Sequence, residues 1–471
     1  MARTKDKSEI RREFARYAIP SVAGMVVSSL YTVVDGIFVG RGVGDLALGG
    51  VNIVFPFIML VIALTMLIAI GGANLAAFLR GRGRQAEANN IFCQSACLLL
   101  AAGAMLFVGA WFFSREICLL LGADADLLPY AESYLRSMAP FVAVQTVGLG
   151  LSVFVRNDNA PNLVMIGTIS GAVANIFLDY LFIMVFQWGI EGAAFATGLG
   201  LTLELAVYLS HFARARGALR FRMPIFSARE IARLAYNGFS SFLMEFCQSA
   251  IAVSFNLVII RHLGPLGVAA YGVVTYICSS FNMILIGITQ GAQPILSFNH
   301  GRGDVEAVKT IYAMGSKTSI AVSIAFVITC FLGGRQLSGM FSDGGGELVE
   351  LSTRMLSYFC VAYIPVGLTL MNILFFQTTE REGRGALVSV LRCVGFVLAF
   401  LLVLPRWWGE YGIYLSFFFG EAANWLVSAI LYAGIEEPES SMEPQPAYAP
   451  IIVSPSPSAA SARLRSISGR Q

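Results

Sequence analysis

A long basic connection in the middle of the chain divides it into two parts. Residues 213–230 read "ARARGALRFRMPIFSARE", and apolar stretches long enough to cross a bilayer lie on both sides. Of the 471 residues, 56% are hydrophobic and 13% are charged, and the mean hydropathy is +0.71. A soluble domain is nearer half apolar and a quarter charged. The sequence therefore predicts a polytopic membrane protein.

A membrane-crossing helix needs about twenty mostly apolar residues. On that rule the sequence contains twelve such segments, six on each side of the basic connection. They are centred near residues 28, 65, 101, 145, 173, 200, 246, 283, 320, 365, 394 and 422. About 25 of the 32 Lys and Arg fall in the N-terminal segment, the even-numbered connections and the tail. This bias predicts that both termini are cytoplasmic.

The predicted fold is an all-α polytopic membrane protein, with twelve transmembrane helices arranged as two pseudo-symmetric six-helix bundles. Its expected parts are a cytoplasmic N-terminus (1–13), an N-lobe with spans one to six (14–212), a basic cytoplasmic linker (213–228), a C-lobe with spans seven to twelve (229–435) and a tail (436–471). The tail is rich in Pro and Ser and is expected to be disordered. No signal peptide precedes the first span, so Met1 is expected to begin the mature chain.

The two halves repeat each other when the sequence is slid along itself until position 41 meets position 261. The matches are Arg41 with Arg261, Gly44 with Gly264, 81–83 with 301–303, 188–189 with 408–409, Gly192 with Gly412 and Gly200 with Gly420. This one offset holds without gaps from position 41 to position 200. Two units with an even number of spans insert the same way up, which predicts an axis along the membrane normal and a cleft between the units. That architecture is typical of transporters.

The repeat also separates residues that the fold needs from residues that only one half needs. Four polar positions of the first half become apolar or glycine in the second. The pairs are Asp35 with Phe255, Asn175 with Gly395, Asp179 with Ala399 and Thr197 with Phe417. The fold therefore does not require these four side chains, and the first half retains them for another reason.

Counting a rise of about 1.5 Å per residue places all four side chains in the outer half of the first bundle. Asn175 and Asp179 are four residues apart and share a helix face. Their oxygens, with those of Asp35 and Thr197, are hard ligands that suit Na⁺ or protons. Two carboxylates in a dry site repel each other, so the pair can take up a proton near neutral pH. The alternative is structural: Asp35 caps the first span and Asp179 bonds a neighbouring helix.

Other polar residues inside the spans give weaker signals. Glu245 in span seven is either an acid that contacts a cation in the cleft or a structurally paired one. Glu204, Glu421 and Arg392 are expected to pair with each other or with backbone. Pro20 removes a helix hydrogen bond from span one, so it permits a kink that is either static or moving.

Several classes of function are excluded by missing motifs. There is no glycine-rich Walker loop, no H-E-x-x-H pattern and no nucleophile–base pair, so neither an enzyme nor a bound cofactor is expected. The eight cysteines are scattered and are expected to be reduced. The net charge of +3 is too small to indicate nucleic-acid binding. The expected partners are small substrates and membrane lipid, and the expected state is a monomer.

Three stretches together resemble the multidrug and toxin extrusion (MATE) transporters, in their bacterial drug-exporter group. They are "YAIPSVAGMVVSSLYTVVDGIFVGRGVGDLAL" (17–48), "NIFLDYLFI" (175–183) and "GITQGAQPILSFNHGRGD" (287–304). The resemblance covers residues 10 to 435 and includes the duplicated layout of twelve spans. It implies two six-helix lobes around a V-shaped cleft.

The resemblance also assigns roles to individual residues. It implies a cation site in the N-lobe formed by Asp35, Asn175, Asp179 and Thr197, and a kink at Pro20. In one sodium-driven branch a Glu of span seven also matters, and Glu245 falls at that place. This sequence has Asn237 where that branch has a proline in span seven, which weakens the assignment of Glu245.

The sequence therefore predicts a secondary active transporter that exports amphipathic organic cations in exchange for H⁺ or Na⁺. One alternative is a flippase for lipid-linked sugars, or a metabolite exporter, on a related fold. A pyrophosphate-binding flippase needs a basic cleft, whereas few basic residues interrupt these spans. A second alternative is a membrane scaffold or receptor that works through its tail, and deletion of residues 436–471 would distinguish it from a transporter.

Overall fold

The computed structural model describes residues 7–340 and 346–435, apart from the side chains at 45, 246–250 and 393–394. Throughout these residues every regular element is a helix. A helix satisfies its own backbone hydrogen bonds, as a segment in the bilayer core must. This confirms the predicted all-helical membrane fold. The predicted disordered tail lies outside the described residues.

The described residues of the first half form seven α-helices and one π-helical turn. They are α1 (Lys7–Gly42), α2 (Asp45–Gly81), α3 (Gln85–Phe112), α4 (Ser114–Leu120), α5 (Leu128–Asn157), α6 (Pro161–Asp179), η1 (Tyr180–Val185) and α7 (Gly189–Ala213). The turn η1 continues α6 directly, and the two form one apolar segment long enough to span a membrane. The short α4 lies between α3 and α5.

The second half begins at α8 and is more interrupted. Its elements are α8 (Ala228–Arg302), α9 (Val305–Gly339), α10 (Glu347–Phe359), η2 (Cys360–Ala362), α11 (Tyr363–Thr378), α12 (Glu382–Val390), η3 (Leu391–Gly395), α13 (Phe396–Val403), α14 (Pro405–Trp408) and α15 (Glu410–Ala433). The elements α10, η2 and α11 follow one another as one span, as do α12, η3 and α13.

The helix count is consistent with twelve crossings. Among the described residues, ten helices are long and apolar enough to cross a membrane. With 75 residues, α8 would be about 110 Å long, far more than one crossing needs. Its backbone turns at Gly264, where φ is 65°, so it forms two helices. The interrupted segment 382–403 is long enough for one further crossing.

The repeat is visible in the backbone itself. Six of the glycines with positive φ form three pairs, and the members of each pair correspond to each other in the repeat. The pairs are Gly44 (118°) with Gly264 (65°), Gly83 (76°) with Gly303 (76°), and Gly189 (63°) with Gly409 (56°). Side chains other than glycine rarely tolerate this region. Each pair therefore preserves the same turn between the same two spans of each half.

The two halves contact each other mainly through α2 and α8. A Cβ atom on Gly81 would lie 2.3 Å from the carbonyl oxygen of Phe298, and one on Gly301 would lie 2.2 Å from that of Phe78. Gly81 and Gly301 are themselves partners in the repeat. Only glycine lets the two backbones approach this closely, so this contact joins equivalent positions of the two halves; a second close contact, between Gly238 of α8 and Leu67 of α2, lies further along α2.

A buried polar contact lies beside this glycine pair. The side-chain oxygen of Asn74 on α2 accepts hydrogen bonds from Gln293 Nε2 at 2.7 Å and Ser297 Oγ at 3.0 Å on α8. Close by, Gly291 of α8 packs against the backbone of Ala18 on α1. The halves are therefore held together by directional bonds as well as by close packing.

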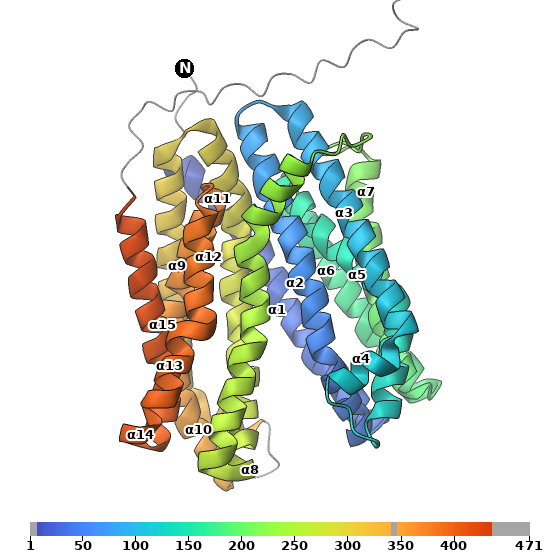
Figure 1. Ribbon diagram of the computed structural model, residues 1–471, viewed down its shortest axis with the longest axis vertical. Helices are drawn as coiled ribbons and strands as arrows, with labels where there is room; N and C mark the ends of the chain where they lie inside the picture. Colours follow the sequence, from blue (N-terminus) through green and yellow to red (C-terminus); the bar gives the residue numbers. More distant parts are fainter. Residues whose placement is uncertain (1–6, 341–345, 436–471) are drawn as a thin grey trace, which may run out of the picture. The chain divides into compact units, whose positions relative to one another are not determined.

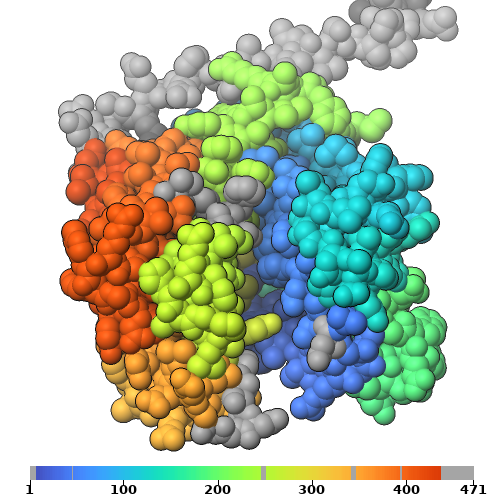
Figure 2. Space-filling model, turned by 60° about the horizontal axis from the view of Figure 1, so that its bottom comes forward, coloured from blue at the N-terminus to red at the C-terminus, as the bar shows by residue number. Residues whose placement is uncertain are grey.

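These contacts lie toward the end of the bundle where α1 begins (Figure 1). At the opposite end the surface is hollowed between the two halves, with α1 and α2 on one side and α8 on the other (Figure 2). A groove therefore separates the halves at one end, while the other end is closed by the packing of α2 and α1 on α8.

Candidate functional site

The four polar positions singled out from the sequence come together in the first half. Asp35 lies on α1, Asn175 and Asp179 lie on α6, and Thr197 lies on α7. The amide of Asn175 donates to Thr197 Oγ1 at 3.4 Å. The carboxyl groups of Asp35 and Asp179 are within hydrogen-bonding reach of each other. The predicted spatial cluster is thus present in the structure.

Close packing of α6 and α7 places these groups together. A Cβ atom on Gly200 of α7 would lie 2.9 Å from the carbonyl oxygen of Gly171 and 3.1 Å from the Cβ of Asn175. The absence of a side chain at Gly200 therefore brings Thr197, one turn away, next to α6. The π-helical turn η1 starts directly after Asp179. Such turns occur often at functional sites.

The oxygens of this cluster lack donors. Asp179 is fully buried and Asn175 is nearly so. Among the described residues, no donor reaches either carboxylate oxygen of Asp179, Oδ1 of Asp35 or Oδ1 of Asn175. A buried ionised carboxylate without a partner is very unfavourable. These oxygens are therefore suited to hold a cation or a proton, and hard oxygen donors fit Na⁺ chemically.

Tyr134 is a fifth member that the sequence did not reveal. It lies on α5, is largely buried and interacts electrostatically with both Asp35 and Asp179. No motif singles it out, and its partner in the repeat is an exposed arginine, Arg354, so the repeat gave no signal either. Tyr134 thus adds a fourth helix, α5, to the surroundings of a site otherwise formed by α1, α6 and α7.

The equivalent place in the second half is aromatic. Phe255 and Phe417, which correspond to Asp35 and Thr197, lie with ring centroids 6.2 Å apart. Phe359 packs against both, with centroid distances of 5.4 Å and 5.7 Å. The same geometry therefore holds an oxygen cluster in one half and an apolar cluster in the other, so the scaffold does not require the polar groups.

The other acids of the spans have partners, as expected for most of them. Arg392 Nε donates to Glu421 Oε1 at 2.8 Å in the second half, which confirms that pairing. Glu204 accepts hydrogen bonds from the hydroxyls of Thr168 and Tyr208 instead, so the predicted pairing of Glu204 with the other two or with backbone is wrong. Glu245 on α8 lies within electrostatic reach of Arg392. Glu245 is therefore not isolated, although it makes no part of the first-half cluster.

Pro20 lies buried inside α1, which remains one helix from Lys7 to Gly42. It is two residues from Ala18, where Gly291 of α8 packs on the α1 backbone. A moving kink at Pro20 would therefore act close to the contact between the halves. The role of Pro20 stays a prediction.

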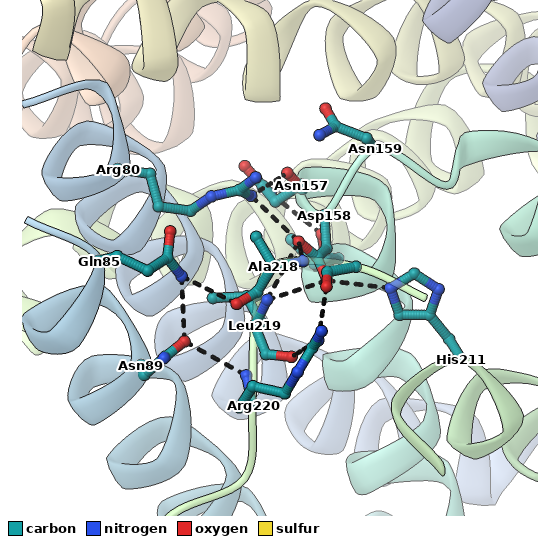
Figure 3. Close-up of polar contacts among 12 residues, drawn as sticks. Arg80, Gln85, Asn89, Asn157, Asp158, Asn159, His211, Ala218, Leu219 and Arg220 are labelled. Atoms are coloured by element: carbon teal, nitrogen blue, oxygen red, sulfur yellow. Dashed lines mark hydrogen bonds and ion pairs between the residues drawn. The ribbon is translucent and has the colours of Figure 1, made fainter. Parts of the chain in front are cut away.

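A second polar network lies at the closed end of the first half, and sequence reasoning missed it. Asp158, between α5 and α6, is almost fully buried. Its carboxylate pairs with Arg80 Nη1 at 3.3 Å and His211 Nε2 at 3.0 Å, and it accepts the backbone N–H of Ala218 at 2.8 Å (Figure 3). This network fixes the connection between α7 and α8 to the first half.

The chain was compared with known protein families and structures. The family model named MatE matches residues 20–181 and again residues 241–402. The chain belongs to the MatE family. The two matches have equal length, and the distance between their starting positions agrees with the offset of the internal repeat to within one position. Family membership and the apolar helices make it a multi-pass membrane protein.

Relatives and solved structures agree with this assignment. The multidrug export protein MepA of Staphylococcus saprophyticus is 24% identical over 431 residues, covering 90% of this chain and 94% of the relative. MepA of Staphylococcus aureus is 21% identical over 431 residues, and the match again covers 90% of this chain and 94% of the relative.

Among solved structures, an outward-facing multidrug resistance MATE family transporter of the MOP superfamily has a TM-score of 0.84 at 21% identity, covering 91% of this chain and 97% of that one. A mutant of the Vibrio cholerae MATE transporter VcmN has a TM-score of 0.85 at 15% identity, with the same coverage. These similarities show the fold.

Proposed function

We propose that this MatE protein is a secondary active transporter that exports amphipathic organic cations in exchange for an inward-moving H⁺ or Na⁺. The carboxylates of Asp35, which is partly exposed, and Asp179, which is fully buried, carry this proposal. They lie in the first half only, they contact each other, and no donor among the described residues reaches Asp35 Oδ1 or either oxygen of Asp179. The two MepA relatives are multidrug export proteins by name, which supports the choice of cargo.

Coupling follows from mutual antagonism between the two ligands. A cation or proton at the Asp35–Asp179 pair neutralises charge in the first half. If the ion favours one arrangement of α1 and the drug favours the other, each weakens the binding of the other by the same factor. A membrane potential of about 100 mV supplies about 2.3 kcal/mol for each charge moved across it. Pro20 and Glu245 are proposed as the hinge of α1 and as a contact for cationic cargo.

The proposed orientation follows from the positive-inside bias, with both termini in the cytoplasm. The closed end of the bundle, where α1 begins, would then face the cytoplasm. The groove between the halves would open to the outside, as the released drug requires.

The test is ethidium transport by purified protein in liposomes, with a pH gradient and a sodium gradient imposed separately. Asp35→Asn should abolish efflux driven by either gradient, because one member of the pair can no longer change its charge. Ser170→Ala is the matched control, since Ser170 lies on α6 with Asp179 and its hydroxyl bonds only to carbonyls of its own helix.

Each outcome has a clear meaning. Efflux driven by one gradient only would identify the coupling ion. Normal efflux by folded Asp35→Asn protein would refute the coupling mechanism. Wild-type protein that responds to neither gradient would favour a lipid-linked sugar flippase instead.

A further inference from the structure

A cavity lies beside the start of α7, outside the groove between the halves. Its volume is about 560 Å³, within the range of about 300 to 1,000 Å³ that is usual for small-molecule sites. The residues that line it are Phe182, Trp188, Glu191, Phe195 and Leu199. A Cβ atom on Gly42, the last residue of α1, would lie 2.3 Å from Ile183 of η1. The cavity is therefore at the end of the bundle opposite to the one where α1 begins.

The cavity follows one face of α7. Glu191, Phe195 and Leu199 are spaced four residues apart, so their side chains succeed one another along about 12 Å of the helix. Thr197 is two residues from both Phe195 and Leu199, which places it about 160° away around the helix. The cavity is therefore on the opposite side of α7 from the first-half cluster and is no part of that site.

Aromatic rings form one wall of the cavity. The rings of Phe182 and Trp188 are stacked, with centroids 4.7 Å apart, and Phe195 meets Trp188 edge-on at 6.3 Å. The backbone N–H of Trp188 donates to the carbonyl of Phe182 at 2.9 Å, which fixes the turn that stacks the two rings. A Cβ atom on Gly192 would lie 3.1 Å from the Cβ of Phe182 and 3.2 Å from that of Trp188. The wall is thus held in place by the backbone before any ligand binds.

Glu191 supplies the charge of the cavity. Its Oε1 accepts a hydrogen bond from Ser133 Oγ of α5 at 2.8 Å. Within residues 7–340 and 346–435, no basic side chain forms an ion pair with this carboxylate. An ionised carboxylate has about four acceptor positions, so one hydroxyl leaves most of its capacity open. A carboxylate next to aromatic rings is an arrangement that attracts organic cations, through charge and through the faces of the rings.

The second half retains the apolar part of this surface but not its charge. The pairs in the repeat are Trp188 with Trp408, Phe195 with Leu415, Leu199 with Phe419, Phe186 with Arg406 and Glu191 with Tyr411. The rings of Trp408 and Phe419 are again close, with centroids 5.9 Å apart. The acid next to Tyr411, Glu410, is already paired with Arg354. The scaffold therefore uses apolar packing here in both halves, whereas the unpaired acid is particular to the first half.

Anchoring at the membrane surface does not account for this arrangement. Aromatic side chains at the ends of spans often lie at the level of the lipid headgroups, and the exposed rings of Phe186 and Trp188 fit that role. Anchoring requires neither a cavity nor a carboxylate beneath the rings. The combination of a hollow, a fixed aromatic wall and Glu191 points to a ligand instead.

We propose that this cavity is a second binding site for organic cations, separate from the groove between the halves. The rings of Phe182, Trp188 and Phe195 contact the apolar groups of the cation, and Glu191 balances its charge. The ligand is a quaternary ammonium or phosphonium ion rather than a metal ion, because one carboxylate among four apolar side chains offers too few oxygens for a metal. The inference goes beyond the proposed function, since binding here requires neither transport nor an ion gradient.

The experiment titrates the detergent-purified full-length protein with tetraphenylphosphonium and follows tryptophan fluorescence. The chain has five tryptophans, so the part of the response that Trp188→Phe removes reports this cavity. For that part, Glu191→Gln should weaken tetraphenylphosphonium binding about fivefold and Glu191→Lys about thirtyfold. Glu116→Gln is the matched control, because Glu116 is an exposed acid on α4 outside the cavity, and it should bind as the wild type does. Triphenylphosphine oxide, which is neutral, should bind equally to the wild type and both Glu191 variants.

Two results would overturn the inference. One is a fluorescence response that Trp188→Phe does not reduce. The other is equal affinity of the wild type and Glu191→Gln for tetraphenylphosphonium, which would show an apolar cavity that holds lipid or detergent chains. Failure of the proposed function is seen separately, because wild-type protein that cannot export ethidium in liposomes would leave this equilibrium binding unaffected.

Discussion

Loss of Arg392 should destabilise the protein far more than loss of an ordinary ion-pair member. Glu421 is fully buried, and Arg392 Nε at 2.8 Å is the partner of its Oε1. Within the described residues, no donor reaches Oε2 of Glu421. Arg392→Met therefore leaves an uncompensated carboxylate in the second half. Breaking one side of a buried pair costs about 3 to 5 kcal/mol.

That cost can be converted into a melting temperature. Large domains shift by about 2 °C for each kcal/mol, so the expected decrease is roughly 6 to 10 °C. Most described cysteines are buried, including Cys118, Cys278 and Cys360, whereas Cys97 is exposed. A thiol-reactive fluorescent dye therefore reports unfolding of the detergent-purified protein in a Cys97→Ser background.

The double variant Arg392→Met/Glu421→Met tests the reasoning. Replacing both members of a buried pair by apolar side chains of similar size is often close to neutral. Most of the lost melting temperature should therefore return in the double variant. Arg354→Met is the control, because Arg354 is exposed and its two ion-pair distances are both 3.5 Å, so little or no shift is expected. If the melting temperature of the double variant falls by the sum of the decreases in the two single variants, the account of an uncompensated buried charge is refuted.

Two further predictions concern the closed end of the bundle. Gly301→Val should separate the two halves, because its Cβ would lie 2.2 Å from the carbonyl oxygen of Phe78. Cross-linking between cysteines placed on α2 and α8 should then fall at least severalfold. Unchanged cross-linking would contradict the close contact. Asp158→Asn should release the connection after α7, because a charge-assisted bond to the N–H of Ala218 is roughly halved in strength. Limited trypsin digestion should then cut the arginine-rich connection faster than in wild type, and equal rates would argue that other contacts hold it.

The repeat explains why so much of the fold could be predicted. The offset of the repeat predicts that Gly44 corresponds to Gly264 and Gly83 to Gly303. The backbone has positive φ at both members of each pair. A turn that favours glycine is visible in both the sequence and the structure. The boundaries predicted for the lobes remain predictions.

The first-half cluster could be predicted because helical spacing and position along each span place its members at one depth. Asn175 and Asp179 are one turn apart, and depth counting placed Asp35 and Thr197 at the same level. The missed groups, Tyr134 among them, depend on which helices are neighbours. Span order does not determine helix neighbours, so their positions could be seen only in the structure.

The close contact between α2 and α8 determines how far the rest of α2 can move. The two backbones touch from Leu67 to Gly81, the last residue of α2, so about 33 Å of this helix, from its start to Leu67, extends beyond the contact. A bend of about 10° at the edge of that contact would move the far end of the helix by roughly 6 Å, while the touching backbones would stay in place. The mouth of the groove can therefore widen or narrow by about the width of a small aromatic molecule without separating these contacts. Opening the contact end itself requires the two backbones to part and the bonds to Asn74 to break.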